Sequence, residues 1–282
     1  MIIAIDESGS FVSSNTINSW CVVSAYVFSE RIKSKSYVVL KNLKKTAGAN
    51  DKQEIKLKHV AENDYFIFLR DLSRLKGALF SVATDSYINT NDILINHRTV
   101  QADKIRENVP RMLYEGGRKG VSILSDEIDS LSPQLYAQLQ CQIVLLDEIL
   151  HRAILYYVQR DPYTLRKFKW RIDQKNTTKT TYEQAFQKVV CPILQTISFR
   201  EPMIFLKEGD YSHMEPFLYS EGEVPEYIEA YGKKLSSGVD IGKMIRDDME
   251  FPDSKQTCQF KSLTYWHLAL ESAFALNFLI MI

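Results

Sequence analysis

The chain opens with MIIAIDESGSF, Met1 to Phe11, in which consecutive aliphatic residues lead into two acids and a small-residue turn. Residues 2–5 show no polar alternation, which is typical of a strand buried on both faces in the middle of an α/β sheet. Ligands of such sheets bind at the carboxyl ends of the strands, where Asp6 would lie. The stretch predicts either an active-site strand that presents Asp6 and Glu7, or a turn that Asp6 caps through its own side chain.

The composition predicts a single large α/β domain. A chain of 282 residues with 45% hydrophobic content can bury a large core. Lys and Arg together number 35, as do Asp and Glu, so any contact with nucleic acid must depend on local patches. Four widely separated cysteines lack metal-binding spacing and favour reduced thiols in a cytoplasmic protein. The apolar residues 273–282 are too short for a membrane span and predict a docked helix or a contact with a second copy.

Hydrophobic periodicity predicts strands and helices along the rest of the chain. Glycines at 116, 117 and 120 indicate a turn, followed by an acidic loop over 126–129. Residues 209–253 favour an irregular lid or an oligomer arm. Strands are expected at 19–28, 78–87, 165–172 and 203–206, and helices at 30–48, 63–75, 90–114, 132–158, 181–195 and 260–278.

The expected strand at 165–172 alternates cleanly between two kinds of side chain. Aromatic and aliphatic residues would face the core, while Lys167, Lys169 and Arg171 would form a basic ribbon that ends at Asp173. Cations beside an acid suit a phosphodiester site, in which the cations hold phosphates and the acid carries metal. The same pattern is also typical of an edge strand that lysines protect from aggregation.

Four motifs together resemble the domain-of-unknown-function 3800 family. They are DESG at 6–9, EIK at 54–56, the aspartate of WRIDQKN at 170–176, and DSK at 253–255 shortly before Gln259. The family is regarded as ribonuclease-H-like and is widespread in bacteria and phages, often near defence genes. The resemblance spans nearly the whole chain. It implies a mixed central sheet flanked by helices in one domain over 1–282, with a helical insertion at about 90–160 and the lid or arm at about 209–253.

The resemblance also implies a metal-dependent nuclease that acts on nucleic-acid phosphodiesters. Asp6 and Asp173 would be the principal ligands of Mg²⁺ or Mn²⁺. Glu54 would be a second acid that binds the metal, or a structural partner, and Glu7 would orient the turn or assist the metal. The implied nucleic-acid-binding residues are Lys56, Lys167, Lys169, Arg171 and Lys175, and the implied auxiliary residues are Asp253, Lys255 and Ser262.

Ser262 departs from the family pattern. It stands where family members usually carry an acid, and a neutral hydroxyl cannot supply the charge that a second divalent ion needs. The alternative interpretation is therefore a catalytically degenerate ribonuclease-H-like scaffold that binds a protein or nucleic-acid partner.

Overall fold

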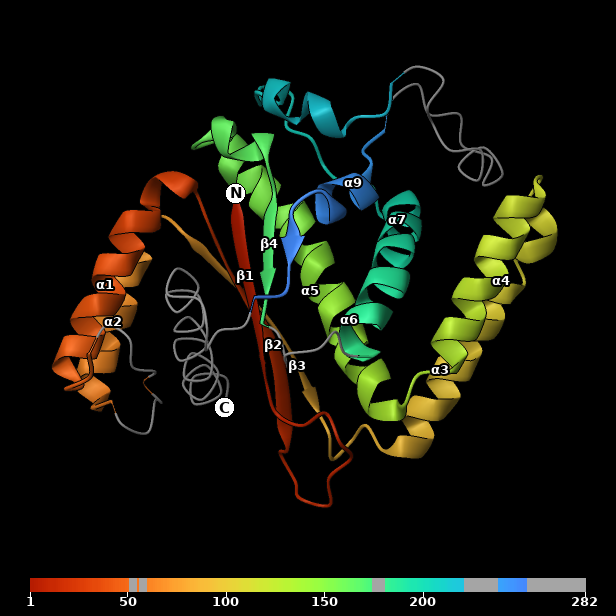
Figure 1. The fold of residues 1–282 in the computed structure, drawn as a ribbon, viewed down its shortest axis with the longest axis horizontal. Coiled ribbons are helices and arrows are strands. Elements are labelled where there is room, and N and C mark those ends of the chain that lie inside the picture. The colour runs from red at the N-terminus through yellow and green to blue at the C-terminus, as the bar shows by residue number, and fades with distance from the viewer. Residues whose placement is uncertain (51–54, 56–59, 174–180, 221–237, 253–282) are drawn as a thin grey trace.

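The structure is a computed structural model, and it describes residues 1–50, 55, 60–173, 181–220 and 238–252. Within these ranges the chain is a mixed α/β protein, as the sequence predicts (Figure 1). No helix in the described ranges combines the length and the apolar character that a membrane crossing requires.

One mixed sheet forms the centre of the described fold, with the strand order β3-β2-β1-β4-β5. β2 is antiparallel to both of its neighbours, whereas β4 is parallel to β1 and β5 is parallel to β4. The carboxyl ends of β1, β3, β4 and β5 therefore lie at the same edge of the sheet. The strands are β1 (Ile2–Ser8), β2 (Trp20–Phe28), β3 (Ala78–Asp85), β4 (Lys169–Ile172) and β5 (Met249–Glu250).

Helices cover both faces of the sheet (Figure 1). α1 (Lys33–Thr46) and α2 (Glu62–Ser73) lie on one face, and the long α5 (Pro133–Val158) lies on the other. Ser132 begins α5 as predicted, because its side chain accepts a hydrogen bond from Leu135 N. The remaining helical segments are η1 (Glu30–Ile32), α3 (Asn91–Arg106), η3 (Val109–Arg111), α4 (Glu115–Asp129), η4 (Pro162–Arg166), α6 (Thr181–Ala185), the π-helix η5 (Phe186–Val190), α7 (Cys191–Arg200), η6 (Ser212–Phe217) and α9 (Ile241–Arg246).

Alternation along β1 divides the buried residues between the two faces. Ile3 and Ile5 belong to the large cluster on the α5 side, whereas Ile2 and Ala4 belong to the smaller cluster with α1 and α2. All four are at most 5% exposed, so β1 is buried on both faces as its sequence predicts.

Several boundaries differ from the sequence predictions. The glycine-rich residues 116–120 and the acids that follow form the helix α4, because Ser125 and Ile128 on one face are buried against the rest of the fold. No strand forms at 203–206, and β4 is limited to Lys169–Ile172, since a 3-10 helix occupies the start of the predicted strand. The short β5 and α9 lie inside the region predicted to be irregular.

Two glycines offer a matched test of packing. A Cβ at Gly77 would lie 2.0 Å from the Tyr26 hydroxyl oxygen, whereas a Cβ at Gly120, within α4, would meet nothing within 4 Å. We expect Gly77→Ala to lower the free energy of unfolding by about 1–3 kcal/mol, because a buried ring must move. Gly120→Ala should raise it by about 0.5–1 kcal/mol through helix propensity. Urea denaturation of both variants measures the difference, and equal effects would contradict the close approach at Gly77.

Candidate functional site

Two aspartates meet at the carboxyl ends of β1 and β4. Ile5 and Ile172 are partners in the parallel pairing of these strands, and Asp173 N donates a hydrogen bond to Ile5 O at 3.2 Å. Asp6 and Asp173 therefore follow the last paired residues of adjacent strands, and strand alternation directs both side chains to the same face. The structure brings together the two residues that the sequence analysis chose as principal metal ligands.

Asp6 is buried, with 8% of its surface exposed, and its Oδ1 accepts a hydrogen bond from Glu7 N at 2.7 Å. Both residues lie within β1, paired with Ser24 and Val23 of β2, so this contact reaches the next residue of the strand and is not a cap of the turn that follows. A carboxylate can accept this bond through one oxygen and serve a ligand through the other, because an ionised carboxylate has about four acceptor positions. The contact with Glu7 N is therefore compatible with a ligand role for Asp6.

Glu7 points to the opposite face of β1, where a row of glutamines on α5 holds the turn. Gln138 Nε2 donates to Glu7 Oε1 at 2.5 Å, and Gln142 Nε2 lies 3.4 Å from Glu7 Oε2. One helical turn earlier, Gln134 Nε2 donates to Ser10 O at 2.8 Å. The sequence analysis missed this row, although the spacing of four residues places all three glutamines on one helix face.

Gly9 completes the geometry of the turn. It has a φ of +96°, and a Cβ there would lie 2.7 Å from Cys21 Sγ. Only glycine adopts this backbone conformation at little energetic cost and leaves room for the thiol. The glycine of the DESG motif therefore directs the chain out of β1 directly after Ser8, close to the start of β2.

Tyr182 and Glu183 on α6 were not singled out by sequence reasoning, yet both are buried, and Gln142 connects Tyr182 to Glu7. The Tyr182 hydroxyl is hydrogen-bonded to Gln142 Nε2, and Glu183 is only 2% exposed. Burial raises the pKa of Tyr182 well above its ordinary value, and the charges of Glu7, Glu183 and Asp6 raise it further. A Tyr-Glu pair early in a short helix is a common pattern, so the sequence offered no distinctive signal for this position.

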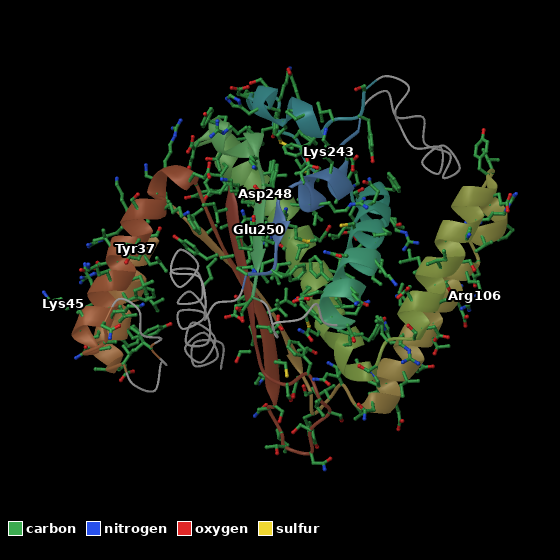
Figure 2. The ribbon with its side chains drawn as sticks, in the orientation of Figure 1. Tyr37, Lys45, Arg106, Lys243, Asp248 and Glu250 are labelled. Atoms are coloured by element: carbon green, nitrogen blue, oxygen red, sulfur yellow. The ribbon has the colours of Figure 1, made fainter. Side chains whose placement is uncertain are left out.

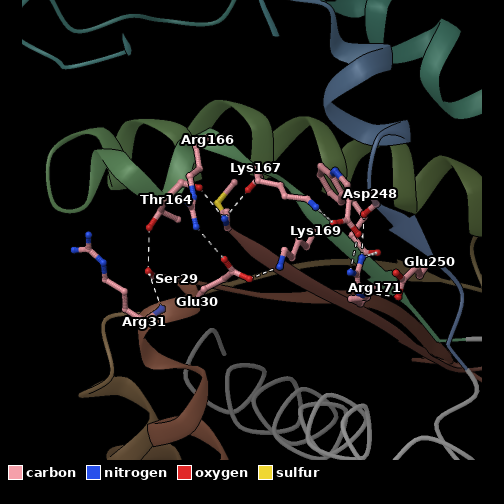
Figure 3. A network of polar contacts seen from close by, with 12 residues as sticks. Ser29, Glu30, Arg31, Thr164, Arg166, Lys167, Lys169, Arg171, Asp248 and Glu250 are labelled. Atoms are coloured by element: carbon pink, nitrogen blue, oxygen red, sulfur yellow. Dashed lines mark hydrogen bonds and ion pairs between the residues drawn. The ribbon is translucent and has the colours of Figure 1, made fainter. Parts of the chain in front are cut away.

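The cations of the basic ribbon each contact an acid, as Figure 3 shows. Lys169 pairs with Glu30 of η1, while Arg171 contacts Asp248 at 2.7 Å and Glu250 at 3.2 Å. Lys167, which precedes β4, lies 2.8 Å from the second oxygen of Asp248.

Asp248 and Glu250, the two acids of the β5 region that contact the ribbon, lie beside β4 in Figure 2. Burial acts to raise the pKa of Asp248, but the hydrogen bonds and charges of Lys167 and Arg171 outweigh it and hold the pKa below its ordinary value. The ribbon therefore joins β4 to η1 and to the segment of β5, and its charge is largely balanced within the protein.

The α-amine of Met1 is buried beside this ribbon. It donates to Thr164 O at 2.7 Å and to Lys167 O at 2.6 Å, and Met1 is 3% exposed. Burial is the main cause that lowers the pKa of the amine from 8.0 to about 5, although Glu30 acts in the opposite direction. The folded chain therefore carries this amine uncharged at neutral pH.

This pKa predicts a pH dependence of stability. Below pH 8 the amine of the unfolded chain binds a proton, whereas the amine of the folded chain accepts one only near pH 5. The contribution of the neutral amine to the free energy of unfolding is therefore complete above pH 8 and is lost as the pH falls towards 5. The free energy of unfolding should fall by on the order of 3 kcal/mol across this window. Urea denaturation measures the fall, and NMR titration of the ¹⁵N-labelled amine assigns it. An amine that titrates near its ordinary value in the folded chain would contradict the prediction.

The other predicted site residues lie outside the described residues. They are Glu54, Lys56, Lys175, Asp253, Lys255 and Ser262. Within the described ranges, no group of three or more His, Cys, Asp or Glu side chains is arranged to hold a metal ion. In this part of the chain the candidate site consists of Asp6 and Asp173, with Glu7 next to Asp6 in β1 and Tyr182 connected to Glu7 through Gln142.

Three comparisons with known proteins complete the description of the site. No protein-family model, no curated protein and no solved structure matches the chain. The resemblance to the domain-of-unknown-function 3800 family therefore depends on the motifs quoted above, and the function must be argued from the geometry of the site.

Proposed function

We propose that the chain is a ribonuclease-H-like, metal-dependent nuclease that acts on the phosphodiester bonds of nucleic acid. The observation that carries the proposal is the adjacency of Asp6 and Asp173 at the ends of two parallel central strands. Residues 167 positions apart in the sequence share one face and one edge of the sheet. A simple turn cap at Asp6 would not require the second aspartate.

The sheet supports the ribonuclease-H-like part of the proposal. β1 lies at the centre between β2 and β4, and β2 alone among the described strands runs against the others. This arrangement is compatible with the mixed central sheet, flanked by helices, that the family resemblance implies. The carboxyl end of the first strand, where Asp6 lies, is also the usual position of a functional site in open α/β sheets.

The donor set fits a hard divalent cation. Asp6 and Asp173 offer carboxylate oxygens, which Mg²⁺ and Mn²⁺ prefer, and two neighbouring carboxylates repel each other unless a cation or a proton lies between them. When bound, the ion would supply activation of water and stabilisation of the charge that develops on the phosphate. The side chains of Asp6 and Asp173 would hold it, and Glu54, which lies outside the described residues, is the expected further acid.

A second candidate function is a scaffold that binds a partner without catalysis. The pairing of Lys169 and Arg171 with acids of the same chain favours it, because phosphates would have to compete with Glu30 and Asp248 for these cations. The serine at 262 favours it as well. Retention of both Asp6 and Asp173 on one face favours the nuclease.

A cleavage assay separates the two functions. The purified chain would be incubated with labelled single-stranded and double-stranded DNA and RNA, in the presence of Mn²⁺, Mg²⁺ or EDTA. The nuclease proposal expects cleavage of at least one substrate with a divalent ion and none with EDTA. The scaffold predicts retention of a substrate without cleavage under every condition. Cleavage that persists in EDTA would argue against the proposed metal dependence.

A further inference from the structure

The strand β3 forms one edge of the described sheet. It pairs with β2 on one side, and no described strand pairs with it on the other side. β1 and β2 are buried along almost their whole length, whereas Leu79 of β3 is 44% exposed and residues 80–84 are half-buried. The outer side of β3 is therefore accessible over most of the strand.

The pairing with β2 determines which backbone groups of β3 face outward. Ser86 N donates a hydrogen bond to Ser19 O at 2.9 Å, and this pair continues the register of the two strands. In an antiparallel ladder, hydrogen-bonded pairs alternate with pairs that make no hydrogen bond. Residues 78, 80, 82 and 84 therefore bond to β2. The N–H and C=O groups that point away from the sheet belong to Leu79, Ser81 and Ala83.

These outward groups have no hydrogen-bond partner in the part of the chain that the structure describes. Natural proteins usually protect such an edge by keeping the strand short, by a bulge, or by lysine and proline residues. β3 has eight residues in continuous register with β2, and its sequence ALFSVATD contains neither lysine nor proline. The edge is therefore suited to the addition of a further strand.

The side chains of β3 suit pairing with a second copy of the same strand. In an antiparallel pair centred on Ser81, Leu79 would lie opposite Ala83 of the second copy, and Phe80 opposite Val82 of the second copy. A larger side chain thus meets a smaller one on each face of the sheet. The same register places the outward N–H and C=O groups of the two copies opposite each other, so that they can bond reciprocally.

The charges at the two ends of β3 are also complementary in this arrangement. Asp85, the only charged residue of the strand, lies at its end, and Lys76 lies shortly before its start. Antiparallel pairing brings the Asp85 end of one copy to the Lys76 end of the other, whereas parallel pairing would bring like charges together.

We propose that β3 is a dimerisation edge, at which two copies of the chain pair antiparallel around a two-fold axis at Ser81 and form one continuous sheet. Such an interface is isologous, because the same strand is used on both sides. Tyr87 and Ile88, which follow the strand, are 42% and 63% exposed and would supply apolar surface beside it. The dimer uses neither Asp6 nor Asp173, so it stands whether or not the chain cleaves nucleic acid.

Sedimentation velocity of the full chain measures the dimer, and amide hydrogen exchange followed by NMR locates it. The amides of residues 79, 81 and 83 should be protected in the dimer and should exchange rapidly in the monomer that forms on dilution. The amides of residues 80, 82 and 84 should be protected in both states, because they bond to β2. Protection that alternates in this way distinguishes edge pairing from a dimer that forms elsewhere.

Ser81→Lys would place two like charges directly opposite each other at the two-fold axis, and should weaken the dimer about 10- to 100-fold. Ser81→Ala is the matched control. Both variants lose the contact between the hydroxyls of Ser81 and Ser24 at 2.8 Å, but alanine adds no charge, so its dimer should be as stable as that of the unmodified chain.

A second variant keeps the test decisive if Ser81→Lys folds poorly. Ala83→Pro removes an outward N–H without removing a hydrogen bond to β2, and an edge strand tolerates proline at such a position. This variant should fold and should also dimerise more weakly.

The proposal would be overturned by an unmodified chain that stays monomeric up to about 1 mM, or by a dimer in which the amides of residues 79, 81 and 83 exchange freely. Folded Ser81→Lys and Ala83→Pro variants that dimerise as the unmodified chain does would overturn it as well. A monomer whose outward amides become protected only when an unrelated extended peptide is added would also overturn it, and would assign the edge to a strand of another protein.

Discussion

Asp6→Asn is expected to reduce metal-dependent cleavage roughly a thousandfold or more, while the melting temperature stays nearly unchanged. The variant removes one of the two carboxylate charges at the ends of the paired strands β1 and β4. In the unmodified chain Glu7 N donates a hydrogen bond to Asp6 Oδ1 at 2.7 Å. An asparagine side chain offers an oxygen at the same position, so the local structure should persist. Cleavage in Mn²⁺ and thermal unfolding of the same preparation provide the two measurements.

Asp85→Asn is the matched control for this prediction. Asp85 also ends a strand at this edge of the sheet, is 7% exposed, and accepts a hydrogen bond from Tyr87 N at 2.9 Å, which asparagine can reproduce. Asp85 lies on β3, two strands away from β1. The Asp85→Asn variant should therefore cleave nucleic acid as the unmodified chain does. If Asp6→Asn retains full cleavage, or if Asp85→Asn loses as much, the Asp6–Asp173 pair is not the catalytic centre.

Trp170→Ala is expected to lower the free energy of unfolding by about 4–6 kcal/mol. The ring is fully buried in the cluster on the α5 side, and its Nε1 donates to Met244 O of α9 at 2.8 Å. The truncation would leave a large cavity beside Ile3, its partner in β1, and would also leave a buried carbonyl without its donor. Urea denaturation monitored by circular dichroism gives the change.

Trp170→Phe separates the two contributions. It keeps most of the apolar volume but removes the N–H donor, so the loss should be about 1–3 kcal/mol. Equal losses in the two variants would indicate that the contact with α9, rather than the filled volume, is what stabilises this part of the sheet. A loss below about 2 kcal/mol for Trp170→Ala would show that the site collapses around the smaller side chain.

Periodicity identified the elements whose burial pattern is simple. The unalternated residues 2–5 predicted a central strand, and the alternation around Trp170 predicted one buried and one polar face, both of which the structure confirms. The glycines at 116 and 120 misled the prediction, because α4 gains its stability from packing against its neighbours, which local propensity does not include. The two-residue β5 is too short to leave a periodic signal.

The candidate site also has one part that the sequence identifies and one part that it does not. Asp6 and Asp173 could be identified as candidate metal ligands from the sequence, because each follows a recognisable strand. The acids that pair with the basic ribbon could not be identified from the sequence, because Glu30 lies more than a hundred residues before Lys169 and Asp248 more than seventy residues after Arg171. Such partners depend on how distant segments pack.

The sequence by itself determined the apolar first strand, the acids at its end and the long α5 with its serine cap, because each follows from the spacing of neighbouring residues. Only the tertiary structure decided that the strands of Asp6 and Asp173 pair, that Glu7 lies on the opposite face, and that Gln142 connects Glu7 to Tyr182. The physical reason is that strand pairing and helix docking bring together side chains whose separation along the chain carries no local signal.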